Sequence, residues 1–278
     1  MRKLIFPAVM LLGFGSGAFA QNKNLIDVKE GQKYIVENKI NTQSTTEVQG
    51  QSMETNMDAT SIYSIVVNKV ADSIKLTNTV SGMKFSSSQM GQEIKFDSEK
   101  KEDIEGPIGS SLKDLLNNPK SITISKTGEV AKKSPQEENN VSNPLTNQLG
   151  DFESSGFGAS LAFMALPAKL KVGNTWTENT ENGGNTSVTT YTVKSLSENV
   201  ATLSITGTNN TEMKMEQMGM EMTVKGKATV TGEQIVNIAT GVIQSNTTTQ
   251  NIIGTVDAMG MSFPTKTKMS STTTVKML

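Results

Sequence analysis

The stretches SVTTYTVK at Ser187–Lys194 and ATLSITG at Ala201–Gly207 decide the fold class of this 278-residue chain. Single apolar residues stand there among Ser, Thr and Gly at mostly alternate positions, the pattern of half-buried strands. The same texture predicts further strands at Lys33–Ile40, Ser61–Lys69, Ser73–Thr79, Glu93–Phe96, Ser121–Ser125, Thr175–Glu178, Met220–Val230, Glu233–Asn237, Gly241–Gly254 and Ser271–Met277. Open twisted sheets of this size curl, so we expect a mainly β chain whose curved antiparallel sheet forms a barrel or half-barrel.

Two segments in the middle of the chain break this pattern. PIGSSLKDLL at Pro107–Leu116 has apolar residues at helical spacing and stops before a proline. GASLAFMAL at Gly158–Leu166 is apolar on nearly all sides, which predicts a buried helix. We expect these two short helices to lie across the concave face of the sheet. The mixed acidic and basic residues from Asp97 to Glu105 predict a solvated loop rather than a catalytic carboxylate pair.

The two halves of the chain resemble each other weakly. At a constant offset of 128 residues, Tyr63 aligns with Tyr191, and QMGQEI at 89–94 aligns with QMGMEM at 217–222. We interpret this as a weak internal duplication with pseudo-repeats over about residues 31–100 and 173–230. The segment between them is too helical for a plain linker, so the prediction is a single β-rich domain over residues 21–278.

The first residues have the features of an export signal. Arg2 and Lys3 precede an apolar run, and Ala18-Phe19-Ala20 forms a cleavage site, so residues 1–20 are predicted to be a signal peptide. The remaining chain contains no stretch of the ~20 apolar residues that a membrane helix needs, and it is expected not to span a membrane. Without any cysteine it offers no acceptor for a lipid anchor at its N-terminus. These features predict a periplasmic or secreted protein.

The composition excludes several kinds of chemistry. The chain has no His and no Cys, which rules out Ser-His-Asp and Cys-His nucleophiles, His- or Cys-ligated metals and disulfides. Its 26 Lys and Arg residues balance 27 Asp and Glu residues, unlike the basic surface of a nucleic-acid-binding protein. We therefore expect no enzyme activity, no cofactor, no metal held by such ligands and no nucleic-acid partner.

Methionines are the most distinctive feature of the sequence. A turn-like unit with a central glycine recurs at Gly50, Gly91, Gly219 and Gly260, flanked by Met or Gln, and it predicts four hairpin tips whose methionines cluster. Three interpretations remain open. The thioethers fill an irregular core, they line an adaptable apolar cavity for a lipid-like or lipoprotein ligand, or they bind Cu(I) as soft ligands.

Short motifs along the chain resemble those of a family of uncharacterised exported proteins of the Bacteroidota. They are Gly31–Tyr34, Gly50–Met53, Pro107-Ile108-Gly109, Leu166-Pro167 and Gly173–Trp176. The family has no established activity. The resemblance implies a fold similar to periplasmic lipoprotein carriers and other lipid-binding half-barrels, in which a curved sheet holds helices against its concave face.

These patterns lead to one functional hypothesis and one principal alternative. The hypothesis is a non-catalytic envelope protein that binds an apolar ligand, a lipid or a lipoprotein, in a groove lined by Met, Leu and Phe. The alternative is a structural or protein–protein interaction module with a filled core, and Cu(I) binding is a further possibility. The sequence predicts no particular oligomeric state. The candidate ligand-binding residues are Phe163, Met164, Met213, Met215, Met218, Met220 and Met222.

Overall fold

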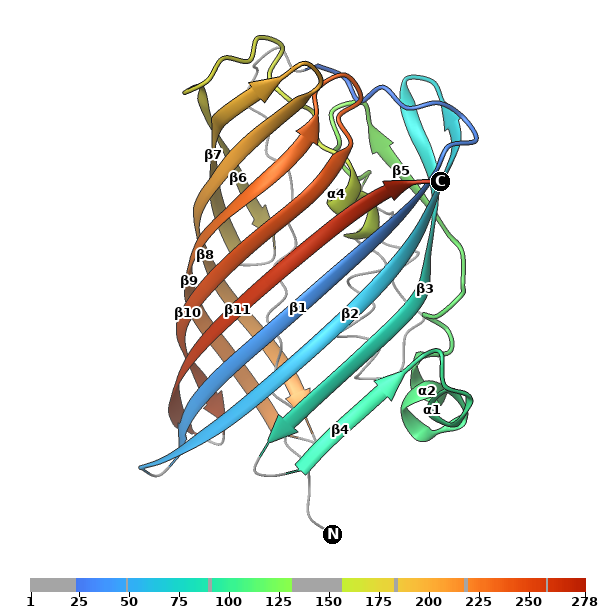
Figure 1. Ribbon diagram of the computed structural model, residues 1–278. Helices are drawn as coiled ribbons and strands as arrows, with labels where there is room; N and C mark the ends of the chain where they lie inside the picture. The colour runs from blue at the N-terminus through green and yellow to red at the C-terminus, as the bar shows by residue number, and fades with distance from the viewer. Residues whose placement is uncertain are drawn as a thin grey trace.

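The computed structural model describes residues 24–48, 50–89, 92–131, 157–182, 185–217, 220–258 and 260–278. The predicted signal peptide lies outside these residues. Within them the chain forms one 11-stranded antiparallel sheet (Figure 1). The strands are β1 (Lys33–Val48), β2 (Gln51–Val70), β3 (Ser73–Gln89), β4 (Gln92–Asp97), β5 (Lys120–Ser125), β6 (Thr175–Asn182), β7 (Asn185–Ser197), β8 (Val200–Gln217), β9 (Met220–Asn237), β10 (Ile243–Ala258) and β11 (Met261–Met277).

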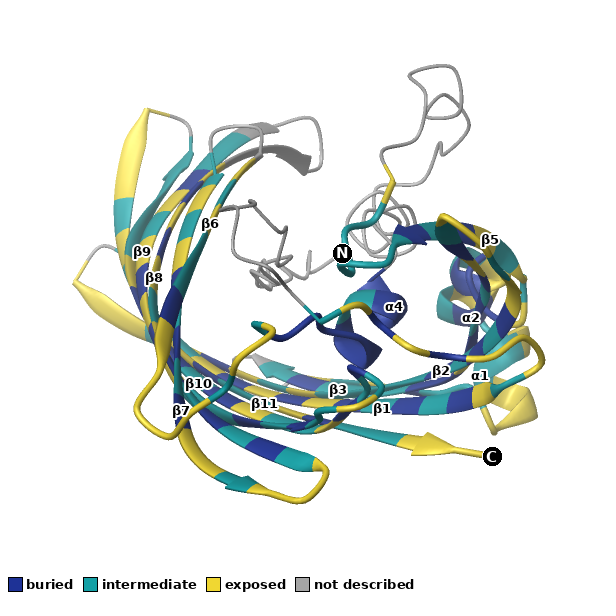
Figure 2. Cartoon of the chain, turned by 90° about the horizontal axis from the view of Figure 1, so that it is seen from above, coloured by how far each residue is buried: buried dark blue, intermediate teal, exposed yellow. Residues whose placement is uncertain are grey.

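The sheet is strongly curved but open. Its strand order is β4-β3-β2-β1-β11-β10-β9-β8-β7-β6, and β5 pairs with β3 beside this path. The last strand, β11, pairs with the first, β1, and so joins the two halves of the chain. The edge strands β4 and β6 do not pair with each other, and the view from above shows a trough (Figure 2). The predicted antiparallel sheet is confirmed, and of the two predicted forms it is the half-barrel.

The strands are longer than the sequence pattern predicts. Strand β1 continues past Ile40 to Val48, and β9 is one strand where two were predicted. In these added parts Ser and Thr occupy both faces, so the apolar alternation disappears while the backbone pairing continues. Hydroxyl pairs across the strands accompany it, such as Ser44 Oγ with Thr267 Oγ1 at 2.9 Å and Thr46 Oγ1 with Thr265 Oγ1 at 3.2 Å.

The predicted glycine turns lie between consecutive strands. Gly50 joins β1 to β2 with φ 79°, and Gly260 joins β10 to β11 with φ 74°, which confirms both turns. Gly91 and Gly219 lie outside the described residues, between β3 and β4 and between β8 and β9. The antiparallel register brings all four connections to the same end of the sheet, which we call the hairpin end.

The opposite end of the trough, which we call the packed end, holds the main core. Helix α4 (Phe157–Ala162) is almost entirely buried and contacts β1, β2, β3 and β10 (Figures 1 and 2). The segment before β1 is tied there as well, because the backbone N–H groups of Asn24 and Ile26 donate to the carbonyls of Leu166 and Lys126. One apolar cluster surrounds Tyr34 and Phe163, whose rings meet edge to face at 5.3 Å. A second surrounds Trp176 and Tyr191.

The helices differ in detail from the prediction. The charged segment expected to be a loop contains a one-turn helix, α1 (Lys101–Glu105), followed by α2 (Pro107–Leu112). Helix α2 is shorter than predicted, although Leu115 and Leu116 after it remain buried in the first cluster. Leu116 forms a bridge with Val80 of β3, so this segment packs at the β3 side of the sheet.

The same backbone arrangement precedes β1 and β6. Gly31, with φ 86°, donates its N–H to Val67, and Gly173, with φ 87°, donates its N–H to Val193, both at 2.8 Å. At both places the residue after the glycine, Gln32 or Asn174, accepts a hydrogen bond. Its side-chain oxygen accepts from the backbone N–H of the residue three positions earlier, Lys29 or Lys171. The two hairpins that start the halves of the sheet are therefore built alike.

Candidate functional site on the concave face

A band of buried apolar side chains crosses the concave face outside both core clusters. Residues directly opposite each other in an antiparallel pair share a face, so the register identifies which positions point inward. Residues opposite each other on neighbouring strands form a row across the sheet. In one row Met269 of β11 lies opposite Gln250 of β10, which lies opposite Val230 of β9. In the next row Ile252 of β10 lies opposite Ala228 of β9. We call this set the inner band. It consists of Ile40, Val224, Ala228, Val230, Ile252 and Met269, all buried and absent from the two clusters.

Charged side chains are kept off this face. On β1 and β11, Glu37, Lys39, Lys266 and Lys268 occupy the outward positions between the inward residues. Among the described side chains of β1 and β8–β11, no inward position carries a charge. Charges on inward positions occur towards the edges of the sheet, where Glu178 of β6 lies opposite Thr189 and Lys120 of β5 lies opposite Asn78. The described side chains that line the centre of the trough are therefore uncharged.

Three buried polar side chains interrupt the inner band. Thr42 lies opposite Met269, Gln250 lies beyond Met269 in the same row, and Asn209 lies opposite Ala228. Asn209 is only 1% exposed, yet neither its Oδ1 nor its Nδ2 has a hydrogen-bond partner. Thr42 Oγ1 and Gln250 Oε1 are also buried without a partner. A buried polar atom without a hydrogen bond is costly, so these three residues, the polar trio, call for an explanation.

One group of inward polar residues towards the packed end is satisfied internally. Asn38 Oδ1 accepts hydrogen bonds from Ser271 Oγ at 2.9 Å and from Thr273 Oγ1 at 3.1 Å. Further unpartnered atoms occur on Asn78, Asn246 and Trp176, away from the inner band in the register. The polar trio differs from these because its members lie among the residues of the inner band.

The structure places the predicted ligand-binding residues in two distant regions. Phe163 belongs to the first core cluster, and Met164 belongs to the second. Met222 lies near the hairpin end of β9, opposite Ala258, and is half-buried. Gln234, the partner of Met164, is twelve residues along β9 from Met222, a separation of roughly 40 Å at about 3.3 Å per residue. Phe163 and Met164 therefore do not share a groove with Met222.

The other candidate methionines are only partly described. Met213 and Met215 lie in β8, and Met220 lies in β9, with Met215 opposite Met222 in the register. Their side chains, and Met218 as a whole, lie outside the described residues. A methionine cluster at the hairpin end, and with it the Cu(I) hypothesis, stays a prediction.

The sequence analysis missed the inner band and the polar trio. The available signal was the alternation of residues in β9 and β10, where Val224, Ala228 and Val230 or Gln250 and Ile252 repeat every second position. Ala, Val, Asn and Gln are common in any strand-rich sequence, so this alternation does not distinguish these residues from those of other strands.

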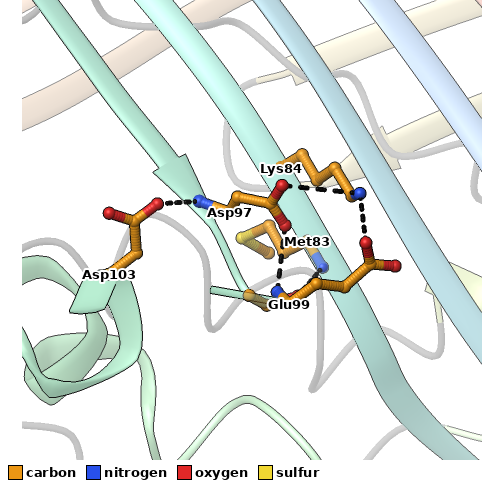
Figure 3. Close-up of polar contacts among 6 residues, drawn as sticks. Met83, Lys84, Asp97, Glu99 and Asp103 are labelled. Atoms are coloured by element: carbon orange, nitrogen blue, oxygen red, sulfur yellow. Dashed lines mark hydrogen bonds and ion pairs between the residues drawn. The ribbon is translucent and has the colours of Figure 1, made fainter. Parts of the chain in front are cut away.

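The charged group next to β4 is a second candidate site. Lys84 Nζ lies 2.6 Å from Glu99 Oε2 and 3.5 Å from Asp97 Oδ2, and Asp103 Oδ2 accepts from the backbone N–H of Asp97 (Figure 3). The hydrogen bond to Glu99 raises the pKa of Lys84. The pKa of Asp97 is lowered mainly by the hydrogen bond that the backbone N–H of Glu99 donates to its Oδ1. The positive charge of Lys84 lowers it further.

In this arrangement Lys84 offsets part of the carboxylate charge, and Asp103 ties α1 to the end of β4. Across the described part of the chain, no group of three or more Asp and Glu side chains is arranged to hold a metal ion. We therefore assign the Lys84 group a structural role and treat the inner band as the candidate functional site.

Comparisons with known proteins bear on family and fold. The profile of a family of unknown function, DUF6263, matches residues 71–134 and 131–243, which together cover more than half of the chain. No curated protein sequence matches this chain. In the part of the chain that the structure describes, no helix has the length and apolar character needed to cross a bilayer.

Among solved structures, this chain is similar to a lipovitellin chain from a structure described as showing lipid–protein interactions in lipovitellin. The TM-score is 0.51 and the sequence identity is 11%. The match covers 90% of this chain and 25% of the lipovitellin chain, so this chain spans about a quarter of that length. At this identity the likeness shows the fold alone. An outer-membrane channel from Pseudomonas putida F1 gives a TM-score of 0.23 at 8% identity, covering 91% of this chain and 98% of that chain.

Proposed function

The chain belongs to DUF6263, a family of unknown function, and we propose that this member is a non-catalytic protein that binds an apolar, lipid-like ligand on the concave face of its sheet. The ligand lies along the inner band, between the packed end and the hairpin end. The binding surface is therefore different from the groove of Phe163, Met164 and Met213–Met222 that the sequence suggested.

The observation that carries this proposal is the inner band itself. Six buried apolar residues line the trough but belong to neither core cluster, so they are not needed to hold α4 against the sheet. These side chains are at most 7% exposed without a ligand, so an apolar chain has to open the space over them, and the gain of about 25 cal/mol per Å² comes from the ligand's own apolar area removed from water. A concave, mostly apolar surface with a few polar groups is the usual form of a small-molecule site.

Two further features support the proposal. The fold is similar to that of lipovitellin, whose structure reports lipid–protein interactions, although a shared fold is a weak warrant for a shared function. The described inward side chains of β1 and β8–β11 include no carboxylate or amine for acid–base chemistry, which supports a binding role for this face.

We place the protein in the cell envelope or outside the cell, on the basis of the signal sequence at residues 1–20. Asn24 already donates its backbone N–H to Leu166, so the fold begins a few residues after the expected cleavage site. The relation to exported proteins of the Bacteroidota and to lipoprotein carriers stays a prediction.

Neighbouring isoleucines on opposite faces of β10 provide the test. Ile252 is 5% exposed on the inner face, whereas Ile253 is 67% exposed on the outer face. The mature protein, stripped of bound lipid, is titrated with the uncharged apolar fluorophore N-phenyl-1-naphthylamine. We expect Ile252→Ser to weaken binding by about tenfold or more, because a buried aliphatic contact is worth ~1.5–3 kcal/mol. Ile253→Ser should leave binding within about twofold of wild type.

A second variant protects the test against misfolding. Val230→Thr keeps the side-chain shape while placing a hydroxyl in the inner band, and circular dichroism checks that each variant retains the sheet. Equal binding by wild type, Ile252→Ser and Val230→Thr would place the probe elsewhere and contradict the proposal. A wild-type protein that binds no probe would favour the alternative, a structural or interaction module with a filled interior.

A further inference from the structure

We infer that the ligand of the inner band is an uncharged acyl lipid whose head carries both a hydrogen-bond donor and a carbonyl, such as a monoacylglycerol or a ceramide. This inference rests on the proposed function and makes it more specific. It is carried by the polar trio together with the lack of charge on the described inward side chains of β1 and β8–β11.

The trio defines what the head group must supply. Gln250 Oε1 and Asn209 Oδ1 are acceptors and need a hydroxyl or amide N–H from the ligand. Asn209 Nδ2 is a donor and needs an acceptor such as an ester or amide carbonyl. Thr42 Oγ1 can serve either way. A hydrocarbon or a simple ester would leave at least the two amide oxygens without a partner.

The spacing of the trio suits an extended head-group region rather than one atom. Thr42 and Gln250 are separated by β11, so their backbones lie about 10 Å apart at ~4.8 Å per strand. Asn209 is two strands beyond Gln250, on the far side of β9. Residues of the inner band, Met269, Val230 and Ala228, lie between them in the register. Polar and apolar parts of one amphiphile can therefore be held side by side.

The lack of inward charge argues against an ionic head. An ionised carboxylate or phosphate moved into this surface would lose its hydration, and no described Lys or Arg side chain of β1 or β8–β11 faces it. Lysines of these strands, such as Lys266 and Lys268, lie on the outer face. An uncharged head that is rich in hydroxyl or amide groups avoids this cost and satisfies the trio.

The inference is tested by competition against bound N-phenyl-1-naphthylamine with three lipids that share one oleoyl chain. The lipids are 1-monooleoylglycerol, methyl oleate and oleate at pH 8. Monooleoylglycerol has donors and a carbonyl, methyl oleate has only the carbonyl, and oleate is charged. We expect monooleoylglycerol to bind at least tenfold more tightly than methyl oleate, and oleate to bind most weakly.

Shape-conserving variants connect this preference to the trio. The double variant Asn209→Leu/Gln250→Met removes the unpartnered amide groups. The control is Asn210→Leu, the same kind of change on the outer face, where the Asn210 side chain donates a hydrogen bond to Thr186. The double variant should bind methyl oleate and monooleoylglycerol within about twofold of each other. Its resistance to urea without ligand should equal or exceed that of wild type, because no internal hydrogen bond is lost. Asn210→Leu should keep the lipid preference.

The outcomes separate the inference from the function on which it rests. If none of the lipids displaces the probe, the proposed lipid-binding function fails. If all three displace it equally, or if the double variant keeps the preference for monooleoylglycerol, the function stands and the inference is overturned. A double variant that unfolds in much less urea than wild type also overturns it, since the trio would then have partners within the protein.

Discussion

The side-chain amide of Gln234 donates a hydrogen bond to the sulfur of Met164, with Nε2 and Sδ 2.9 Å apart in the interior of the protein. Gln234 is on β9, and Met164 follows α4, so this contact ties the segment after the helix to the sheet. The backbone N–H of Met164 also donates to the carbonyl of Gly241. Met164, selected from the sequence as a ligand contact, is thus engaged in holding the packed end together.

This pair makes a prediction about stability. Met164→Leu keeps the apolar volume but leaves the buried Gln234 amide without its acceptor, so we expect a loss of about 1–3 kcal/mol in the free energy of unfolding. Adding Gln234→Leu should recover part of that loss. A urea-unfolding double-mutant cycle measures the coupling, and additive losses would show that the sulfur contact contributes nothing.

Two glycines with similar backbone angles should respond differently to substitution. Gly241 and Gly260 have φ of 71° and 74°, so alanine at either position incurs a backbone cost of ~1–2 kcal/mol. A Cβ at Gly241 would also lie 2.7 Å from the carbonyl oxygen of Met164, whereas nothing lies within 4 Å at Gly260. Gly241→Ala should therefore lower the urea midpoint clearly more than Gly260→Ala. Equal midpoints would contradict the close approach at Gly241.

The Lys84 group predicts a dependence of stability on pH. Because the folded protein holds the pKa of Asp97 below its ordinary value, the carboxylate stabilises the fold above that ordinary value. This contribution is lost as the pH falls through the folded pKa. Asp97→Asn should lower the urea midpoint at pH 7, and the difference from wild type should shrink as the pH approaches 3.

Lys84→Met is the matched comparison for Asp97→Asn. It leaves the backbone N–H of Glu99 in place, which is the larger cause of the shift. Most of the pH dependence should therefore remain in Lys84→Met. A constant difference between wild type and Asp97→Asn from pH 7 to pH 3 would rule out the assigned shift.

Export predicts a defined N-terminus. The protein recovered from outside the cytoplasm should begin at Gln21, the residue after Ala18-Phe19-Ala20. Intact-mass measurement of the recovered protein checks this directly. Ala20→Lys should block processing and leave the longer form, and a full-length mass in the wild type would contradict the signal-peptide assignment.

Much of the fold could be read from local alternation. Tyr191 and Val193, or Leu203 and Ile205, repeat every second residue, and their side chains are buried on one face of the sheet. Gly50 and Gly260 marked turns because few other residues adopt positive φ there. These signals act over a few residues, and a short window of sequence contains them completely.

Local sequence patterns were therefore sufficient to predict the strand-rich class, the turns and a buried apolar segment near Gly158–Leu166. Tertiary structure alone decided where β1 and β11 pair, and hence which residues meet across the trough. Asn209 and Gln250 are 41 positions apart in the chain and come to one face only through the register of β8, β9 and β10. That register depends on the pairing of whole strands, so no local pattern could separate the inner band from the core at Phe163 and Met164.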